Sequence, residues 1–294
     1  MELLKVDNLQ KYYPKKKALD SVSFSVSPGE IVALIGRNGA GKTTLMNSIV
    51  GINHPTGGAV YYKGKNLLID RRDLREFGIL IDATFFDYLT VYDNLRLLME
   101  ASGATNKQSM HQTIMKTLRL VGLEGQARQK VKSFSFGMKQ RLGLAQTLLV
   151  PISFLILDEP FIGLDPSGKE LLKNVIIGKA RQDKCGILFS SHDLSDVSEI
   201  CDRVVMISNG HKVYDGAFRE EKQYFVCLDP DSLKTSTELF PDLDGQITFS
   251  DKTISFESKA LIQPVLQRLI QNGISICDLQ VHENSLYDLF KQEA

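Results

Sequence analysis

The sequence predicts an α/β protein with a parallel sheet, and three observations lead to that prediction. Short apolar runs, typical of buried strands, alternate along the chain with segments of helical periodicity. A glycine-rich loop follows one such run, residues 31–35, and opens a helical segment. A second apolar run, residues 154–157, ends directly in the two carboxylates Asp158 and Glu159. Strands that deliver polar groups at one end are typical of parallel sheets that carry a site at that edge.

Length and composition fit this class and exclude several others. The 294 residues suffice for one large domain and a small one. Lys+Arg and Asp+Glu number 35 each, so the charge gives no reason to expect nucleic acid or acidic lipid as a partner. The four cysteines show no Cys-x-x-Cys spacing and are expected to be reduced thiols of a cytosolic protein. The apolar stretch 142–157 is interrupted by polar residues and falls short of the about twenty residues of a membrane span.

The expected elements define a large domain over residues 1–217. Its first third predicts strands at 3–6, 22–26 and 31–35, a helix at 42–50, and an antiparallel arm through 57–62. Helical periodicity over about residues 83–149 indicates an inserted helical subdomain. The alternation then resumes, with strands expected at 154–157, 186–190 and 203–207 and helices at 169–180 and 194–200.

The pattern changes after Gly216, and residues 218–294 are expected to form a small α+β accessory domain. Short alternating runs predict strands there, and longer amphipathic segments predict two helices. The expected strands are 225–228, 246–249 and 253–256, and the expected helices are 261–271 and 285–292. No residue of this domain suggests catalysis.

The glycine-rich loop is the first functional motif. Residues 36–43 match Gly-x-x-x-x-Gly-Lys-Ser/Thr, a loop whose backbone N–H groups close around phosphates at a helix N-terminus. Lys42 is expected to reach the β- and γ-phosphates, and the Thr43 hydroxyl to ligate Mg²⁺. The residues expected to bind nucleotide here are Gly36, Arg37, Asn38, Gly39, Ala40, Gly41, Lys42, Thr43 and Thr44.

Two later strand ends supply the remaining chemistry. Asp158 is expected to hold Mg²⁺ through water, and Glu159 to accept a proton from the attacking water. His192, at the end of the following strand, is a candidate hydrogen-bond donor to the γ-phosphate. The alternative for His192 is a purely structural histidine, and for the two carboxylates a pair of exposed acids at a strand end.

Three further motifs give the chain a family resemblance. Residues 134–138, Phe-Ser-Phe-Gly-Met, precede an intact Lys-Gln-Arg. Gly163-Leu-Asp165 follows the two carboxylates, and Tyr13 lies in the run of residues 11–20, Lys-Tyr-Tyr-Pro-Lys-Lys-Lys-Ala-Leu-Asp. Together with the phosphate loop, over about residues 1–217, these motifs resemble the ATP-binding cassette (ABC) ATPases. Residues 134–138 fall on the family's signature Leu-Ser-Gly-Gly-Gln. The fold class that this implies is a P-loop core of ABC-ATPase type with an antiparallel arm and a helical insertion.

The resemblance implies a dimer that holds two ATP molecules head to tail. In it, Ser135, Gly137 and Met138 of one chain would contact the ATP that the other chain's phosphate loop binds. Tyr13 matches the aromatic that stacks on adenine, although by itself it could be an ordinary surface tyrosine. His192 matches the family's switch histidine, and Gly163 to Asp165 match the loop that crosses the dimer interface.

Two departures from the family pattern stand out. The first is in the signature, where Phe136 replaces a glycine and Met138 replaces a glutamine. A bulky residue at position 136 must take ordinary helix-start geometry rather than the left-handed backbone. Asp82 stands where the family has a glutamine that helps to coordinate Mg²⁺ and senses the membrane partner. Asp82 is therefore a candidate catalytic and metal-binding residue, with a solvated loop acid as the alternative.

These departures and the C-terminal residues 285–290 are similar to features of bacterial exporter ATPases for bacitracin, lantibiotics and other antimicrobial peptides. The implied protein is an ATPase subunit at the cytoplasmic face of the membrane, with ATP and Mg²⁺ as cofactors. Its implied partners are a second ABC ATPase chain, identical or related, and a membrane permease contacted through residues 82–92. The alternatives are export of lipid, polysaccharide or drugs, a soluble ABC ATPase acting on ribosomes or DNA, and a kinase or ligase that shares only the phosphate loop.

Overall fold

The computed structural model describes residues 2–14, 16–217, 221–229, 239–240, 243, 247–250 and 253–284. The chain divides into two compact units, Met1–Phe218 and Arg219–Ala294. Each unit has its own apolar core. The predicted α/β class is confirmed, and the helix expected at 285–292 lies outside the described residues.

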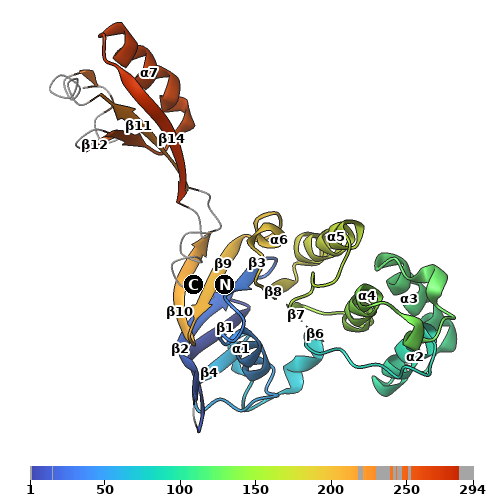
Figure 1. Cartoon of the computed structure of the whole chain (residues 1–294). Helices are drawn as coiled ribbons and strands as arrows, with labels where there is room; N and C mark the ends of the chain where they lie inside the picture. The colour runs from blue at the N-terminus through green and yellow to red at the C-terminus, as the bar shows by residue number, and fades with distance from the viewer. Residues whose placement is uncertain are drawn as a thin grey trace. The chain divides into compact units, whose positions relative to one another are not determined.

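A six-stranded sheet runs through the first unit, with its strands in the order β10-β9-β3-β8-β7-β6 (Figure 1). Its strands are β3 (Ile31–Ile35), β6 (Phe77–Leu80), β7 (Phe154–Leu157), β8 (Gly186–Ser191), β9 (Arg203–Ser208) and β10 (His211–Ala217). Neighbours from β9 to β6 are parallel, and only β10 is antiparallel to its neighbour. All residues of β3 and β7 are buried, which accounts for their continuous apolar runs. Because parallel strands end at one edge, the residues that follow β3, β8, β7 and β6 meet there.

An antiparallel sheet in the order β2-β1-β4-β5 covers one side of this core. Its strands are β1 (Leu4–Tyr13), β2 (Lys16–Val26), β4 (Gly57–Tyr62) and β5 (Lys65–Asn66). Helix α1 (Lys42–Ile49) buries Leu45, Met46 and Ile49 in an apolar cluster with residues of both sheets. The strands β1 and β2 are longer than the sequence predicts, because register shifts interrupt their alternation of buried and exposed residues.

The helical subdomain lies between β6 and β7 in the chain. It contains α2 (Val91–Ala101), α3 (Lys107–Leu120) and α4 (Phe136–Thr147), which gather beyond the β6 edge of the sheet (Figure 1). Short 3-10 turns occur within the subdomain at Glu124–Gln126 and Val131–Ser133, and another at Arg72–Glu76 leads into β6. Each of the three helices begins at a side-chain N-cap, a favourable start: Thr90, Asn106 and Ser135 accept backbone N–H bonds.

Two helices, one after β7 and one after β8, lie on the face of the sheet opposite to α1 (Figure 1). Helix α5 (Pro166–Asp183) is longer than predicted, because Asp165 caps it and Pro166 suits the first helical position. Helix α6 (Leu194–Ser198) is capped by Asp193. Burial raises the pKa of the Cys185 and Cys201 thiols to about 12, so both are poor nucleophiles.

The second unit is an antiparallel sheet in the order β12-β13-β11-β14, packed against one helix. Its strands are β11 (Glu221–Leu228), β12 (Ile247–Ser250), β13 (Thr253–Phe256) and β14 (Ile276–Asn284). A 3-10 turn at Lys259–Leu261 leads into α7 (Ile262–Gln271), which buries Val265 and Leu269 against the sheet. Within the described part of the chain, none of the helices has the length and apolar character needed to span a membrane.

Candidate active site

The phosphate loop runs from β3 to α1 and is fixed by close backbone packing. A Cβ atom on Gly36 would lie 2.3 Å from the carbonyl oxygen of Ile207, and one on Gly41 would lie 2.6 Å from that of Ala18. Gly41 has a φ of 116°, in the left-handed region that favours glycine. The remaining loop residues are Arg37, Asn38 and Gly39, which are exposed, Ala40, which is buried, and Thr44, in the first turn of α1.

The ammonium group of Lys42 lies inside this loop. The side chain is only 6% exposed, and its Nζ donates to the carbonyl oxygens of Gly36 at 2.7 Å and Arg37 at 3.4 Å. It also lies 3.3 Å from Oε1 of Glu159. A buried ammonium at a helix N-terminus makes this loop a strong site for an oxyanion.

Thr43 and Asp158 bring two hard oxygen ligands together. Thr43 Oγ1 donates to Asp158 Oδ2 at 2.7 Å, and the Ser190 hydroxyl donates to Asp158 Oδ1 at 2.5 Å. The Asp158 amide donates to the carbonyl of Leu80 at 2.8 Å, which ties the end of β7 to the end of β6. The Asp158 carboxylate is thus fixed beside the start of α1.

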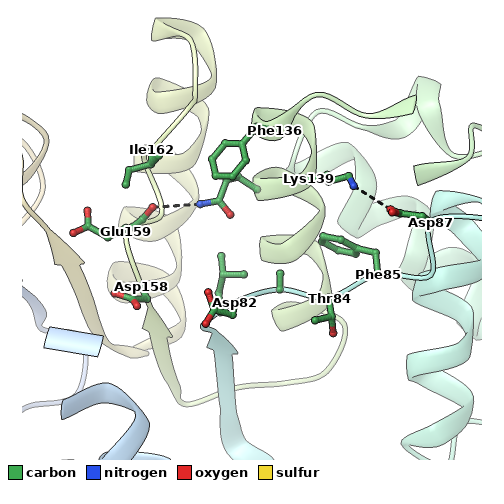
Figure 2. A pocket seen from close by; sticks show the side chains of 12 residues that line it. Asp82, Thr84, Phe85, Asp87, Phe136, Lys139, Asp158, Glu159 and Ile162 are labelled. Atoms are coloured by element: carbon green, nitrogen blue, oxygen red, sulfur yellow. Dashed lines mark hydrogen bonds and ion pairs between the residues drawn. The ribbon is translucent and has the colours of Figure 1, made fainter. Parts of the chain in front are cut away.

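Glu159 is held by its backbone and by both carboxylate oxygens. Its amide donates to Ser190 Oγ at 2.7 Å, and its Oε2 lies 2.9 Å from Nδ1 of His192. With Oε1 near Lys42, the carboxylate lies between a cation and an imidazole. Glu159 has a φ of 46°, uncommon for a residue with a side chain and maintained only where the surroundings enforce it. Figure 2 shows Asp158 and Glu159 side by side at the end of their strand.

Asp82 follows β6, the strand next to β7, and also has a positive φ, 50°. It lines a cavity of about 570 Å³ together with Asp158 and Glu159 (Figure 2). The cavity lies between the carboxyl ends of β6 and β7 and helix α4. Asp87 also lines the cavity but pairs with Lys139, so the other three carboxylates create a negative potential that a divalent cation would offset.

The residues of the signature segment lie at the start of α4. Ser135 is its N-cap and accepts the Met138 amide at 3.3 Å, and Phe136 begins the helix, in the geometry the sequence predicts. Ser135 is exposed, and Gly137 and Met138 are partly buried. Among the described residues, none of these three has a hydrogen bond to the phosphate loop of its own chain. The structure therefore does not bond the signature residues to the phosphate loop of the same chain.

Tyr13 ends β1, next to the turn that leads into β2. Its ring is 43% exposed, and Nζ of Lys11 lies 5.0 Å from the ring centroid. Lys16, just past the turn, donates to the carbonyl of Gly39 at 3.1 Å. This bond places the turn beside the phosphate loop, so an adenine ring stacked on Tyr13 stays a prediction that the geometry permits.

The loops that follow β7 and β8 end in helix N-caps, Asp165 for α5 and Asp193 for α6. Ser167 and Gly168 donate hydrogen bonds to Asp165, which lower the pKa of its carboxyl. Hydrogen bonds from Ser195 likewise lower the pKa of Asp193, the residue after His192. Both carboxylates are anionic at neutral pH, and their negative charge stabilises the positive N-terminal ends of α5 and α6.

Two residues of the site were missed by sequence reasoning. Ser190 bonds to both Asp158 and Glu159, and its position at the end of β8 was a signal that went unused. Gln140, on α4, donates to the carbonyl oxygen of Glu159 at 3.3 Å. No sequence pattern indicated this second contact.

Comparisons with known proteins agree with this geometry. Residues 19–162 match the profile of a family described as ABC transporter. The chain is 32% identical to the bacitracin transport ATP-binding protein BcrA of Bacillus licheniformis, over 98% of this chain and 96% of the relative. It is 37% identical to the lantibiotic transport ATP-binding protein SrtF of Streptococcus pyogenes, over 76% and 96%. A solved ATP-binding subunit of an ABC transporter is 32% identical with a TM-score of 0.66, over 73% of this chain and 90% of the other.

Proposed function

This chain belongs to the ABC transporter ATPases, and from that premise we propose that it is the ATPase subunit of a bacterial exporter of antimicrobial peptides. The family couples ATP hydrolysis to transport. The names of the two relatives, a bacitracin and a lantibiotic transport protein, support peptide cargo over lipid, polysaccharide or drug. The chain would act at the cytoplasmic face of the membrane, bound to a permease.

One structural observation carries the ATPase assignment. The phosphate loop, Asp158 with Glu159, His192 and Asp82 follow four adjacent parallel strands, β3, β7, β8 and β6. A phosphate-binding loop, a carboxylate base and an imidazole therefore lie at one edge of the sheet. Phosphoryl transfer to water needs this combination of oxyanion binding and proton acceptance.

The residues at this edge fit Mg²⁺. Thr43 and Asp158 supply two hard oxygen ligands in contact with each other, and Mg²⁺ typically takes one or two protein ligands and completes its shell with phosphates and water. Asp82 adds a third carboxylate on the same cavity. When bound, the ion would neutralise charge on the nucleotide's phosphates.

When nucleotide binds, Lys42, Glu159 and His192 would each take a separate role. A phosphate beside the loop offers more negative charge than Glu159, so nucleotide would draw the Lys42 ammonium away from that carboxylate. Glu159, still held by Ser190 and His192, would be free to take a proton from the attacking water. With its Nδ1 at Glu159, His192 has its other ring nitrogen available for the γ-phosphate.

The signature residues give the second half of the mechanism. Ser135 and Gly137 stand at a helix N-terminus that makes no hydrogen bond to the described phosphate loop of its own chain. A helix N-terminus favours an oxyanion. We propose that its ligand is the ATP bound by a second copy or a paralogue, so that two chains close around two nucleotides.

Exposed aromatic side chains mark the expected contact with the permease. In the segment between β6 and α2, Phe86 is 51% exposed and Tyr88 67% exposed, with ring centroids 6.0 Å apart. Asn94 bonds to both the amide and the carbonyl of Phe86, which fixes the segment. Phe85, in the same segment, lines the site cavity instead. Phe86 is therefore the cleaner probe of the permease contact.

Replacing Phe86 with alanine should uncouple transport from hydrolysis. Cells that produce the chain with its permease should tolerate more bacitracin or lantibiotic, and Phe86→Ala should reduce this protection several-fold. The ATPase rate of the isolated chain should fall far less. Leu120→Ala, at an exposed apolar position on α3, is the matched control and should protect like the wild type. Full protection by Phe86→Ala, or equal loss of both activities, would contradict the assigned surface.

The charge of Asp82 should make hydrolysis more dependent on magnesium than a glutamine would. Without the ion, a third carboxylate on the cavity repels the nucleotide's phosphates, so Asp82→Gln should need less Mg²⁺ for half-maximal ATPase activity. Magnesium titrations of both proteins check this. Glu170→Gln is the control, because Glu170 is an exposed carboxylate on α5 that bonds to Asn174 and does not line the cavity. Superimposable titrations of the wild type and Asp82→Gln would show that Asp82 is a solvated loop acid.

A further inference from the structure

The loop that carries Glu159 is clamped in its own chain by α4, the helix that begins with the signature residues. Two contacts make this clamp. At one end of the loop, Gln140 Nε2 donates to the carbonyl oxygen of Glu159 at 3.3 Å. At the other, the Phe136 ring lies on Gly163, where an added Cβ would be 2.3 Å from the ring's Cδ1. Figure 2 shows Phe136 beside this loop and a dashed line for the Gln140 bond.

The packing at Gly163 leaves little room for independent motion. Gly163 has a φ of 72°, in the left-handed region, and its carbonyl oxygen would lie 2.8 Å from a Cβ on Gly137. The backbone of the first turn of α4 thus touches the loop directly. A shift of α4 along its axis must therefore move Gly163, or break this contact.

The contact at Glu159 bears on the chemistry. The Glu159 backbone has the uncommon positive φ, and its carbonyl accepts only two described bonds, from Gln140 and from the Ile162 amide, each at 3.3 Å. The Ile162 bond lies within the loop and moves with it. Gln140 is the one of the two that ties the carbonyl to another element.

We infer that Gln140 is a positioning residue for Glu159. Through Gln140, ATP bound by the partner chain would fix the position of the Glu159 base in this chain. The inference rests on the head-to-tail dimer of the proposed function. There, Ser135 and Gly137 engage the partner's ATP and fix α4. Gln140, on the next turn of the same helix, then fixes Glu159 at its own ATP. Each site would be competent only when the other is closed.

Mixed dimers separate this role from a general effect on folding. Two differently tagged copies of the full chain are purified together, and one carries Glu159→Gln, so that a single site hydrolyses ATP. Gln140→Leu removes the donor at similar volume and is placed either with the intact Glu159 or in the other chain. Ser135→Ala is placed in the same two ways as the reference for action across the interface.

The two substitutions should show opposite dependence on placement. Gln140→Leu should lower kcat about three- to tenfold more when it shares a chain with the intact Glu159, the loss expected for one hydrogen bond. Ser135→Ala should cost more in the chain that carries Glu159→Gln, whose signature serves the working site. Gln140→Lys, which keeps a donor, should recover most of the kcat lost by Gln140→Leu.

Three results would overturn the inference. If Gln140→Leu follows the pattern of Ser135→Ala, Gln140 supports the signature and not Glu159. If its effect is equal in both placements, or Gln140→Lys recovers nothing, Gln140 only stabilises the fold. If Ser135→Ala itself is indifferent to placement, the head-to-tail dimer fails and the inference fails with it. The behaviour of Ser135→Ala thus distinguishes failure of the dimer from failure of the Gln140 contact.

Discussion

Glu159→Gln should lower kcat for ATP hydrolysis by about 10²- to 10⁴-fold, the usual contribution of a positioned general base. The substitution removes the proton acceptor but keeps the shape of a side chain that lies between Lys42 and His192. ATP affinity should be retained, because the phosphate loop and Lys42 are untouched. Steady-state ATPase assays and equilibrium binding of a fluorescent ATP analogue measure the two quantities.

Glu170→Gln provides the control for this substitution. Glu170 is an exposed carboxylate on α5, bonded only locally to Asn174 at 3.2 Å, so its replacement should leave kcat close to the wild-type value. Near-normal hydrolysis by Glu159→Gln would remove Glu159 from the role of base. Equal loss of hydrolysis and of ATP binding would point to collapse of the loop.

Asp196→Ala should lower the free energy of unfolding by about 1.5–3 kcal/mol, the contribution of a hydrogen bond to a charged group, because the buried Lys173 keeps Glu199 as a partner. Asp196 is 5% exposed and pairs with Lys169 at 2.7 Å and with Lys173 at 3.4 Å. Lys173 is itself 7% exposed, so its ammonium cannot turn to solvent without rearrangement. Urea-induced unfolding of the first unit, followed by circular dichroism, measures the change.

The neighbouring acid Glu199 is the matched comparison. It pairs with Lys173 at 2.9 Å, but its side chain is 57% exposed. Glu199→Ala should therefore cost less than about 1 kcal/mol, as for exposed ion pairs. Similar losses for the two variants would show that Asp196 is no more buried in solution than Glu199. These pairs join α5 to α6 behind His192, so the same network supports the site.

The sequence was most informative where burial is complete. The strands Ile31–Ile35 and Phe154–Leu157 have the bounds that their apolar runs predict, because strands covered on both faces tolerate no polar residue. The phosphate loop was recognisable for a related reason. Its glycines are required by backbone contacts as close as that between Gly41 and Ala18, which leave few alternatives at those positions.

Elements with mixed surroundings were harder to predict. The strand β6 is four residues long and contains Gly78, and it is a strand because β7 supplies a parallel partner. The strand β14 carries Asp278, Gln280 and other polar residues at the edge of its sheet, where alternation is weak. Both depend on a neighbour distant in sequence, which local patterns do not encode.

The same limit applies to the site. Glu159 was identified from its place after an apolar run, but its contact with Gln140 joins two elements 19 residues apart. Such a contact depends on how α4 packs against the sheet. Periodicity in the sequence indicates which face of a helix is buried, but it does not fix the rotation of the helix precisely enough to predict a single hydrogen bond. The roles of Tyr13, Ser135, Gly137 and Met138 stay predictions, since they involve ligands or a second chain.

Light scattering of Glu159→Gln with and without Mg-ATP tests the central claim, that ATP closes two chains into a clamp, most directly. A variant that binds ATP without hydrolysing it should be monomeric alone and become a dimer of twice the mass with saturating Mg-ATP. Adding Ser135→Ala to the same chain should shift this dimerisation to higher protein concentration. A particle that stays monomeric while ATP is bound would contradict the account.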